Sequence, residues 1–198
     1  TVHTPEWLWL SSGVRAVDHA VETICSLDAN DYTDGTAIQA LKSLSEGLAR
    51  CKADGSDLEG RLKCQIGAWL SMVGIVAGTR LGASHAIGHI LGGSAGVPHG
   101  HTSCVMLPYV LDYNKPVNAD RQRLVAEALG KPDTPASETL HHLIKGLAMP
   151  RTLREVGVQH DDLPRLAENC MLDDWTFSNP RPISSPGQIM EILEAAYG

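Results

Sequence analysis

Apolar residues recur at intervals of three and four positions along almost the whole chain, which is the spacing of helices that each bury one face. No stretch alternates apolar and polar residues in the way that a half-buried strand does. The sequence therefore predicts an all-α fold that forms a single helical domain over residues 1–198. The clearest helical stretches are residues 13–26, 36–51, 58–78, 118–129, 137–147, 161–171 and 187–197.

Several boundaries follow from helix-starting and helix-breaking residues. Pro5 after Thr4 is typical of a helix start, and the small residues 11–13 predict a break before the next helix begins. Residues 28–35 are polar and rich in turn formers, so we expect a loop there. The stretch 66–76 is apolar nearly all round, which predicts that the helix over 58–78 is central and buried.

The segment 81–114 concentrates the candidate chemistry of the chain. It contains His85, His89, His99 and His101, out of nine histidines in total. His85 and His89 are four residues apart, so on one helix their imidazoles share a face. We expect a helix, a tight loop and a second helix, with imidazoles from both helices directed toward one site.

The ends of these two helices can also be predicted. Ser84 is a suitable N-cap for the first helix, and Gly92-Gly93 is a suitable end. Pro98 then restricts the backbone before the second helix, whose apolar run begins at Val105.

Composition and charge exclude several classes of protein. The formal net charge is −7 and the pI is about 5.6, so no basic surface is available to bind nucleic acid or an anionic membrane. No apolar stretch is long enough to span a membrane. The five cysteines show no CxxC spacing, which favours reduced core thiols and a cytoplasmic location.

Three motifs resemble a known family. GVRAVDHAVE near the start, SHAIGHILGGSAGVPHGHTSCVMLPYVLDYN in the middle and NPRPIS near the end resemble the iron-containing (group III) alcohol dehydrogenases, most closely the maleylacetate reductase-like branch. The similarity covers only the carboxy-terminal helical domain of that family, whose fold is also that of dehydroquinate synthase-like proteins. It implies that an amino-terminal α/β domain, which binds NAD(H) or NADP(H), is absent from this chain. No GxGxxG unit occurs in the sequence, so we expect the chain to be a fragment of a longer enzyme.

The resemblance also implies roles for individual residues. In the metal-dependent members an Asp and three histidines hold the ion, and the matching positions here are Arg15, His19, His85 and His99. A guanidinium cannot ligate a cation and repels one, so we expect little bound iron or zinc. Arg15 is then a fixed cation that polarises a carbonyl or binds a substrate carboxylate.

The implied catalytic residues are Arg15, His85 and His89. His89 and the pair Gly92-Gly93 are expected to lie against the nicotinamide. The imidazoles would relay the proton, because the ordinary imidazole pKa lies near neutral pH.

The resemblance implies that the complete enzyme is an oxidoreductase that transfers hydride between a nicotinamide and a small carbonyl or unsaturated acid. The complete enzyme is expected to form a homo-oligomer, and the chain alone to be inactive in redox chemistry. Two other functions fit the sequence. One is a free-standing helical domain that binds a small molecule or performs a lyase or isomerase step, and the other is a structural oligomerisation module. An alternative for Arg15 is that it simply pairs with Asp18 or Glu22 and contacts no ligand.

Overall fold

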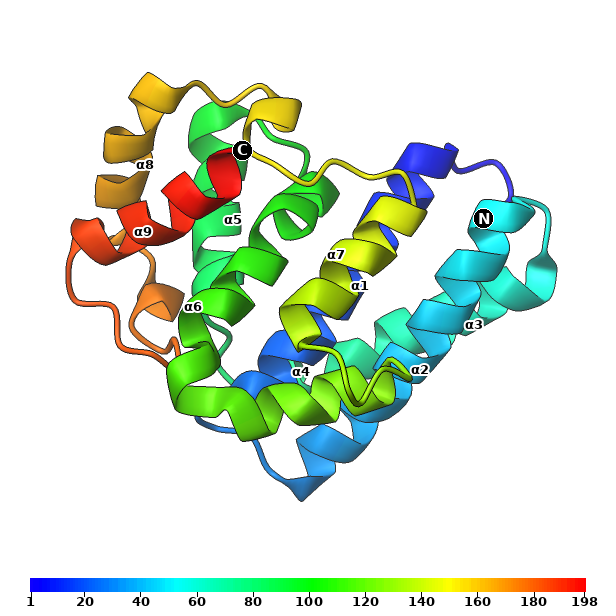
Figure 1. The fold of residues 1–198 in the computed structure, drawn as a ribbon. Helices are drawn as coiled ribbons and strands as arrows, with labels where there is room; N and C mark the ends of the chain where they lie inside the picture. Colours follow the sequence, from blue (N-terminus) through cyan, green and yellow to red (C-terminus); the bar gives the residue numbers. More distant parts are fainter.

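A computed structural model describes all residues from 1 to 198. As predicted, the fold is all-α and contains no strand (Figure 1). The α-helices are α1 (Glu6–Cys25), α2 (Asp31–Ala53), α3 (Leu58–Ser71), α4 (Val73–Val76), α5 (Ala83–Ala95), α6 (His99–Ala128), α7 (Ala136–Gly146), α8 (Leu163–Cys170) and α9 (Pro186–Tyr197). Three short 3₁₀ turns are η1 (Arg154–Val156), η2 (His160–Asp162) and η3 (Asp174–Thr176).

The helices enclose two hydrophobic cores. α1, α2, α3 and α7 surround the first core, and α5, α8 and α9 surround the second. α6 contributes to both, with Leu107 and Leu111 in the first core and Met106 and Val110 in the second. Figure 1 shows α2 and α3 on one side of the molecule and α8 and α9 on the other, with α1, α5 and α6 between them. α1 and α5 therefore meet along the junction between the two cores.

α1 and α2 are longer than the sequence pattern predicted. α1 continues through residues 11–13, where a break was expected. A Cβ on Gly13 would lie 2.3 Å from the Leu48 side chain, so this glycine allows α1 to pack closely against α2. α2 begins at Asp31, inside the predicted loop, because Asn30 and Thr33 form a capping box.

The prediction of one long, buried helix over residues 58–78 was wrong. α3 ends at Ser71 and the single turn α4 follows it. Only one face of α3 packs against α2, and on the other face the Trp69 side chain is 76% exposed; Val76, in α4, is 82% exposed. Hydrophobicity alone did not reveal that this apolar face has no partner within the chain.

The ends of the two histidine-bearing helices also differ from the prediction. α5 continues past Gly92-Gly93 and ends at Gly96, which adopts the left-handed conformation with φ +66°. Ser84 does not cap α5 with its side chain. α6 begins directly after Pro98, before the apolar run that starts at Val105.

α6 also absorbs the helix that was predicted separately over residues 118–129. It continues through Pro108 and Pro116 and has non-helical dihedral angles only at Asn118. The prediction for the last helix was correct, since Ser185 and Gln188 form a capping box at the start of α9.

All five cysteines are buried and free. Burial raises the pKa of Cys25 to about 12 and that of Cys170 to about 12. None of the helices combines the length and the hydrophobicity that a membrane span requires.

Candidate functional site

A polar stripe follows one face of the otherwise apolar helix α1. Arg15, Asp18, His19 and Glu22 are spaced by three, four and seven residues, so they project from the same side of the helix. Arg15, Asp18 and Glu22 are 6%, 0% and 5% exposed. Buried charges are costly unless they have partners, and the partners come from α5 and α6.

Glu22 bridges α1 to the start of α5. Its Oε2 accepts hydrogen bonds from the backbone N–H groups of Gly82 (3.1 Å) and His85 (3.2 Å), and its Oε1 accepts one from the N–H of Ser84 (3.0 Å). Glu22 therefore caps α5 in place of the predicted Ser84.

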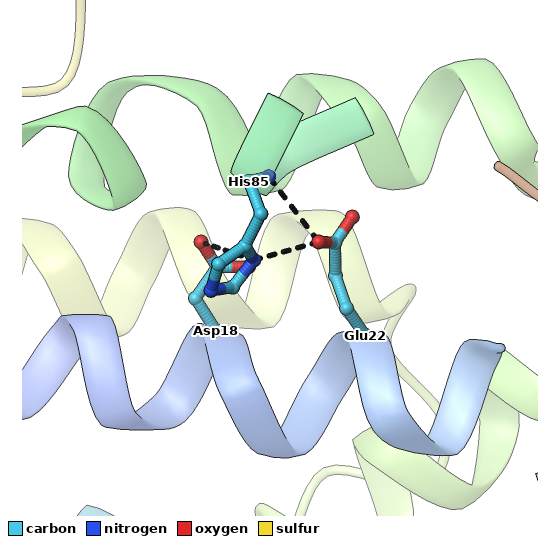
Figure 2. A group of neighbouring side chains, drawn as sticks. All are labelled: Asp18, Glu22 and His85. Carbon is cyan, nitrogen blue, oxygen red and sulfur yellow. Dashed lines mark hydrogen bonds and ion pairs between the residues drawn. The ribbon is translucent and has the colours of Figure 1, made fainter. Parts of the chain in front are cut away.

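The same carboxylate orients the imidazole of His85. The Nδ1 atom of His85 lies 2.7 Å from Oε2 of Glu22. Figure 2 shows the imidazole facing this carboxylate. Burial raises the pKa of Glu22, whereas the three backbone N–H donors lower it. Because three backbone N–H groups donate to its oxygens, we infer that Glu22 is bound as the carboxylate. His85 then carries its proton on Nδ1 and leaves Nε2 as an acceptor.

Asp18 connects α1 to both other helices. Its Oδ2 accepts hydrogen bonds from the hydroxyls of Ser84 on α5 (2.8 Å) and Ser103 on α6 (2.6 Å). Ser103 in turn accepts a hydrogen bond from Nη1 of Arg15 at 3.2 Å. This same Nη1 lies 3.8 Å from Oδ2 of Asp18, so Arg15 also forms the ion pair that the sequence left open.

Two nitrogens of the Arg15 guanidinium make no hydrogen bond within the chain, the buried Nε and Nη2. Unlike Nε, Nη2 is not fully buried, so it remains accessible to a ligand. α5 approaches the guanidinium closely at Gly88, where a Cβ would lie 3.2 Å from Nη1 and 3.0 Å from the hydroxyl of Thr102. Glycine at this position therefore leaves room for the charged group.

Four imidazoles gather beside the guanidinium. The rings of His19 and His85 stack with centroids 4.9 Å apart, and those of His89 and His99 are parallel at 6.3 Å. We call His19, His85, His89 and His99 the imidazole cluster. His85 is buried and His19 is half-buried, whereas His89 and His99 are exposed.

The inner part of the cluster is built to hold neutral imidazoles. Burial lowers the pKa of His85 to about 3, against the opposing charge of Asp18. Burial also lowers the pKa of His19 to about 3, and the nearby charges of His85 and Arg15 act in the same direction. The Nε2 atom of His85 and the Nδ1 atom of His19 are buried and have no hydrogen-bond partner. Both nitrogens therefore lie at the centre of the site without a hydrogen-bond partner in the chain.

The donor set does not fit a divalent metal ion. Three imidazoles would suit zinc or iron, but the fourth position is Arg15, whose charge lowers the pKa of His19, His85 and His99. A dication would meet the same repulsion. Ligand atoms of Asp18, Glu22 and His85 also lie within 4.8 Å of one another. However, Glu22 and His85 already share a hydrogen bond, and Oδ2 of Asp18 already accepts the hydroxyls of Ser84 and Ser103.

The residues proposed to contact the cofactor occupy one end of α5. Gly92 and Gly93 lie in its last turns, and a Cβ on Gly93 would meet no heavy atom within 4 Å. His101 lies outside the cluster and packs edge-on against Trp7 at 5.8 Å. The larger surface hollows also lie elsewhere, including one of about 440 Å³ lined by Lys131 and His142.

Sequence reasoning brought Arg15, His19, His85, His89 and His99 together correctly but missed their partners. Sequence reasoning named Asp18 and Glu22 only as possible ion-pair partners of Arg15 and did not name Asp173. A signal existed in α1, where two acidic residues four apart interrupt an apolar helix face. The residues that sequence reasoning did not name are Ser103, Asp173 and Trp175.

Comparison with known proteins agrees with the motifs. Residues 9–197 match the model of the Fe-containing alcohol dehydrogenase family, C-terminal. The chain is 31% identical to maleylacetate reductase 1 of Cupriavidus pinatubonensis, over 100% of the chain and 54% of that protein. It is 35% identical to the 1,3-propanediol dehydrogenase of Citrobacter freundii, over 98% of the chain and 52% of that protein.

A solved structure shows the same fold. The maleylacetate reductase from Rhizobium sp. strain MTP-10005 superposes with a TM-score of 0.88 at 29% identity, over 100% of this chain and 54% of the other. The chain thus spans about half the length of the curated relatives that it matches. From the matched model, the shared fold and the motifs around His19, His85 and His99, we conclude that this chain belongs to the Fe-containing alcohol dehydrogenase family and corresponds to its carboxy-terminal region.

Proposed function

We propose that this chain is the substrate-side half of an NAD(P)-dependent oxidoreductase that transfers hydride between a nicotinamide and a small carbonyl or unsaturated acid. The observation that carries the proposal is the convergence of Arg15 and the imidazole cluster from α1, α5 and α6 at the junction of the two cores. The names of its relatives, which include reductases and dehydrogenases, agree with this chemistry.

Arg15 is the group that would select the substrate. A buried guanidinium with a free Nη2 binds a carboxylate or polarises a carbonyl, and it stabilises the negative charge that develops on an oxygen during reduction. Substrates that carry a carboxylate are therefore favoured over plain alcohols. Maleylacetate, after which several relatives are named, is such a substrate.

The nicotinamide would supply the hydride chemistry when bound. In this chain His89, Gly92 and Gly93 would lie against it, because they share the exposed face at the end of α5. The nucleotide-binding half would be the part of the relatives that this chain does not cover.

The test is the activity of the complete polypeptide that contains this chain. Consumption of NADH and NADPH would be followed by absorbance with maleylacetate and, in parallel, with a simple aldehyde. We expect turnover with the acid, and Arg15→Ala should lower kcat/KM by about 3 kcal/mol equivalent.

A matched control is Arg123→Ala. Arg123 is exposed and pairs only with Glu127 at 3.5 Å, so its removal should leave kcat/KM unchanged. A loss below ~0.5 kcal/mol for Arg15→Ala would assign this residue a purely structural role. Turnover by the 198-residue chain alone, without nicotinamide, would contradict the redox proposal and support a lyase or isomerase.

A further inference from the structure

The two histidines of the His85–His89 pair are held in the same way by carboxylates from distant parts of the chain. Glu22 binds Nδ1 of His85 at 2.7 Å, and Asp173 binds Nδ1 of His89 through its Oδ2 at 2.8 Å. Both imidazoles therefore carry their proton on Nδ1 and present Nε2 as an acceptor. Asp173 lies in the loop between α8 and η3, far from His89 in the sequence.

The second carboxylate oxygen of Asp173 forms a different hydrogen bond. Its Oδ1 accepts the backbone N–H of Trp175 at 2.9 Å and so caps η3. The Trp175 indole then packs against both histidines, with its ring centre 5.7 Å from that of His85 and 5.2 Å from that of His89. The hydroxyl of Thr176 donates to the carbonyl of Cys170 at 2.6 Å, which ties this turn to α8.

Burial distinguishes the two histidines as proton carriers. The side chain of His85 is 1% exposed and its Nε2 is buried without a hydrogen-bond partner, whereas the side chain of His89 is 38% exposed. A relay must take a proton at one moment and release it at another. His89 is therefore the imidazole that can exchange its proton with solvent between turnovers.

We propose that Asp173 is the positioning residue that fixes the tautomer of His89 and the place of Trp175, so that Nε2 of His89 serves as the proton relay. This proposal rests on the proposed function. In the oxidative direction Nε2 of His89 would take the proton of the substrate hydroxyl, and a bound nicotinamide would supply the acceptor for the hydride of the carbon that bears this hydroxyl. In the reductive direction the His89 imidazolium would give its proton to the carbonyl oxygen of the substrate, and the carbonyl carbon would receive the hydride. In both directions the carboxylate of Asp173 would stabilise the charged imidazolium form of His89.

The tautomer of His89 can be measured without any turnover. Long-range ¹H–¹⁵N spectra of the 198-residue chain at about pH 9, above the ordinary imidazole pKa, distinguish a proton on Nδ1 from one on Nε2. The wild-type His89 is expected as the Nδ1–H form.

The informative variant is Asp173→Asn. The Asn oxygen can still cap η3, and its amide N–H then faces Nδ1 of His89, which must become an acceptor. We expect the proton of His89 to move to Nε2, and Asp173→Glu to retain it on Nδ1. Asp174→Asn is the control, because this neighbouring carboxylate makes no bond to His89.

An unchanged His89 tautomer in Asp173→Asn, or a wild-type His89 already protonated on Nε2, would overturn the proposal. In the complete polypeptide, Asp173→Asn should lower kcat by about 10- to 100-fold with little change in KM, and Asp173→Glu should recover part of the loss. A confirmed tautomer switch in a protein without nicotinamide-dependent turnover would refute the proposed function and leave the role of Asp173 in holding His89 intact.

Discussion

Glu22 offers a direct test of how the site and the fold depend on each other. In Glu22→Gln the amide oxygen can take the place of Oε2 and keep its three donors, which are the N–H groups of Gly82 and His85 and the Nδ1–H of His85. The amide NH₂ must then replace Oε1 and face the N–H of Ser84, which is also a donor. The substitution changes no volume, so its effect is purely electrostatic.

The magnitude follows from these contacts. Three hydrogen bonds lose the assistance of a charge, at about 1 kcal/mol each, and one buried N–H loses its acceptor, at about 1–3 kcal/mol. Removing a buried charge recovers part of this, because burial itself disfavours the carboxylate. The net loss in the free energy of unfolding should be about 3 kcal/mol.

Urea denaturation followed by circular dichroism measures this loss as a lower midpoint at constant slope. Glu127→Gln is the control, since Glu127 is 49% exposed in its side chain and pairs only with Arg123; it should change stability by less than ~0.5 kcal/mol. A loss for Glu22→Gln as small as that of the control would refute the conclusion that Glu22 joins α1 to α5 as a carboxylate.

Three further predictions concern the cluster and its surroundings. Arg15→Asp supplies the missing oxygen ligand beside three imidazoles, so it should bind cobalt or zinc stoichiometrically in elemental analysis, while the wild type and Arg15→Ala stay metal-free. The folded state holds His19 neutral with a pKa of about 3, whereas the unfolded chain takes up a proton below about pH 6.5. Acidification therefore favours unfolding, and between about pH 6.5 and 5 the wild type should lose about 2 kcal/mol of stability relative to His19→Gln; parallel stability curves would contradict this. Gly93→Ala lies in an exposed helix interior with no neighbour within 4 Å, so it should raise stability by about 0.5–1 kcal/mol and raise the KM for the nicotinamide, and an unchanged KM would place the cofactor elsewhere.

The sequence predicted the helical class and the meeting of Arg15 with the imidazoles, because these depend on helical spacing and on motifs. His85 and His89 share a face wherever their helix lies. The convergence with His19 came from the family resemblance, since no local rule relates α1 to α5.

What the sequence could not predict are the interactions that depend on tertiary packing. Asp173 follows His89 by 84 residues, and no pattern in either segment indicates their hydrogen bond. The cap of α5 was assigned to Ser84 because local rules consider only adjacent residues, whereas Glu22 of another helix makes the bonds. The predicted burial of the helix that carries Trp69 was wrong for the same reason, since an apolar face is buried only when a partner packs against it.

The five buried thiols can be used to measure local opening of the fold. A thiol reagent in solution reaches a sulfur only when the surrounding helices part, so the labelling rate counts such openings. Cys25 and Cys104 belong to the first core and Cys170 to the second. Equal rates at these positions would mean that α6 makes the two cores open together, and unequal rates would mean that the halves of the molecule fluctuate separately on either side of the imidazoles.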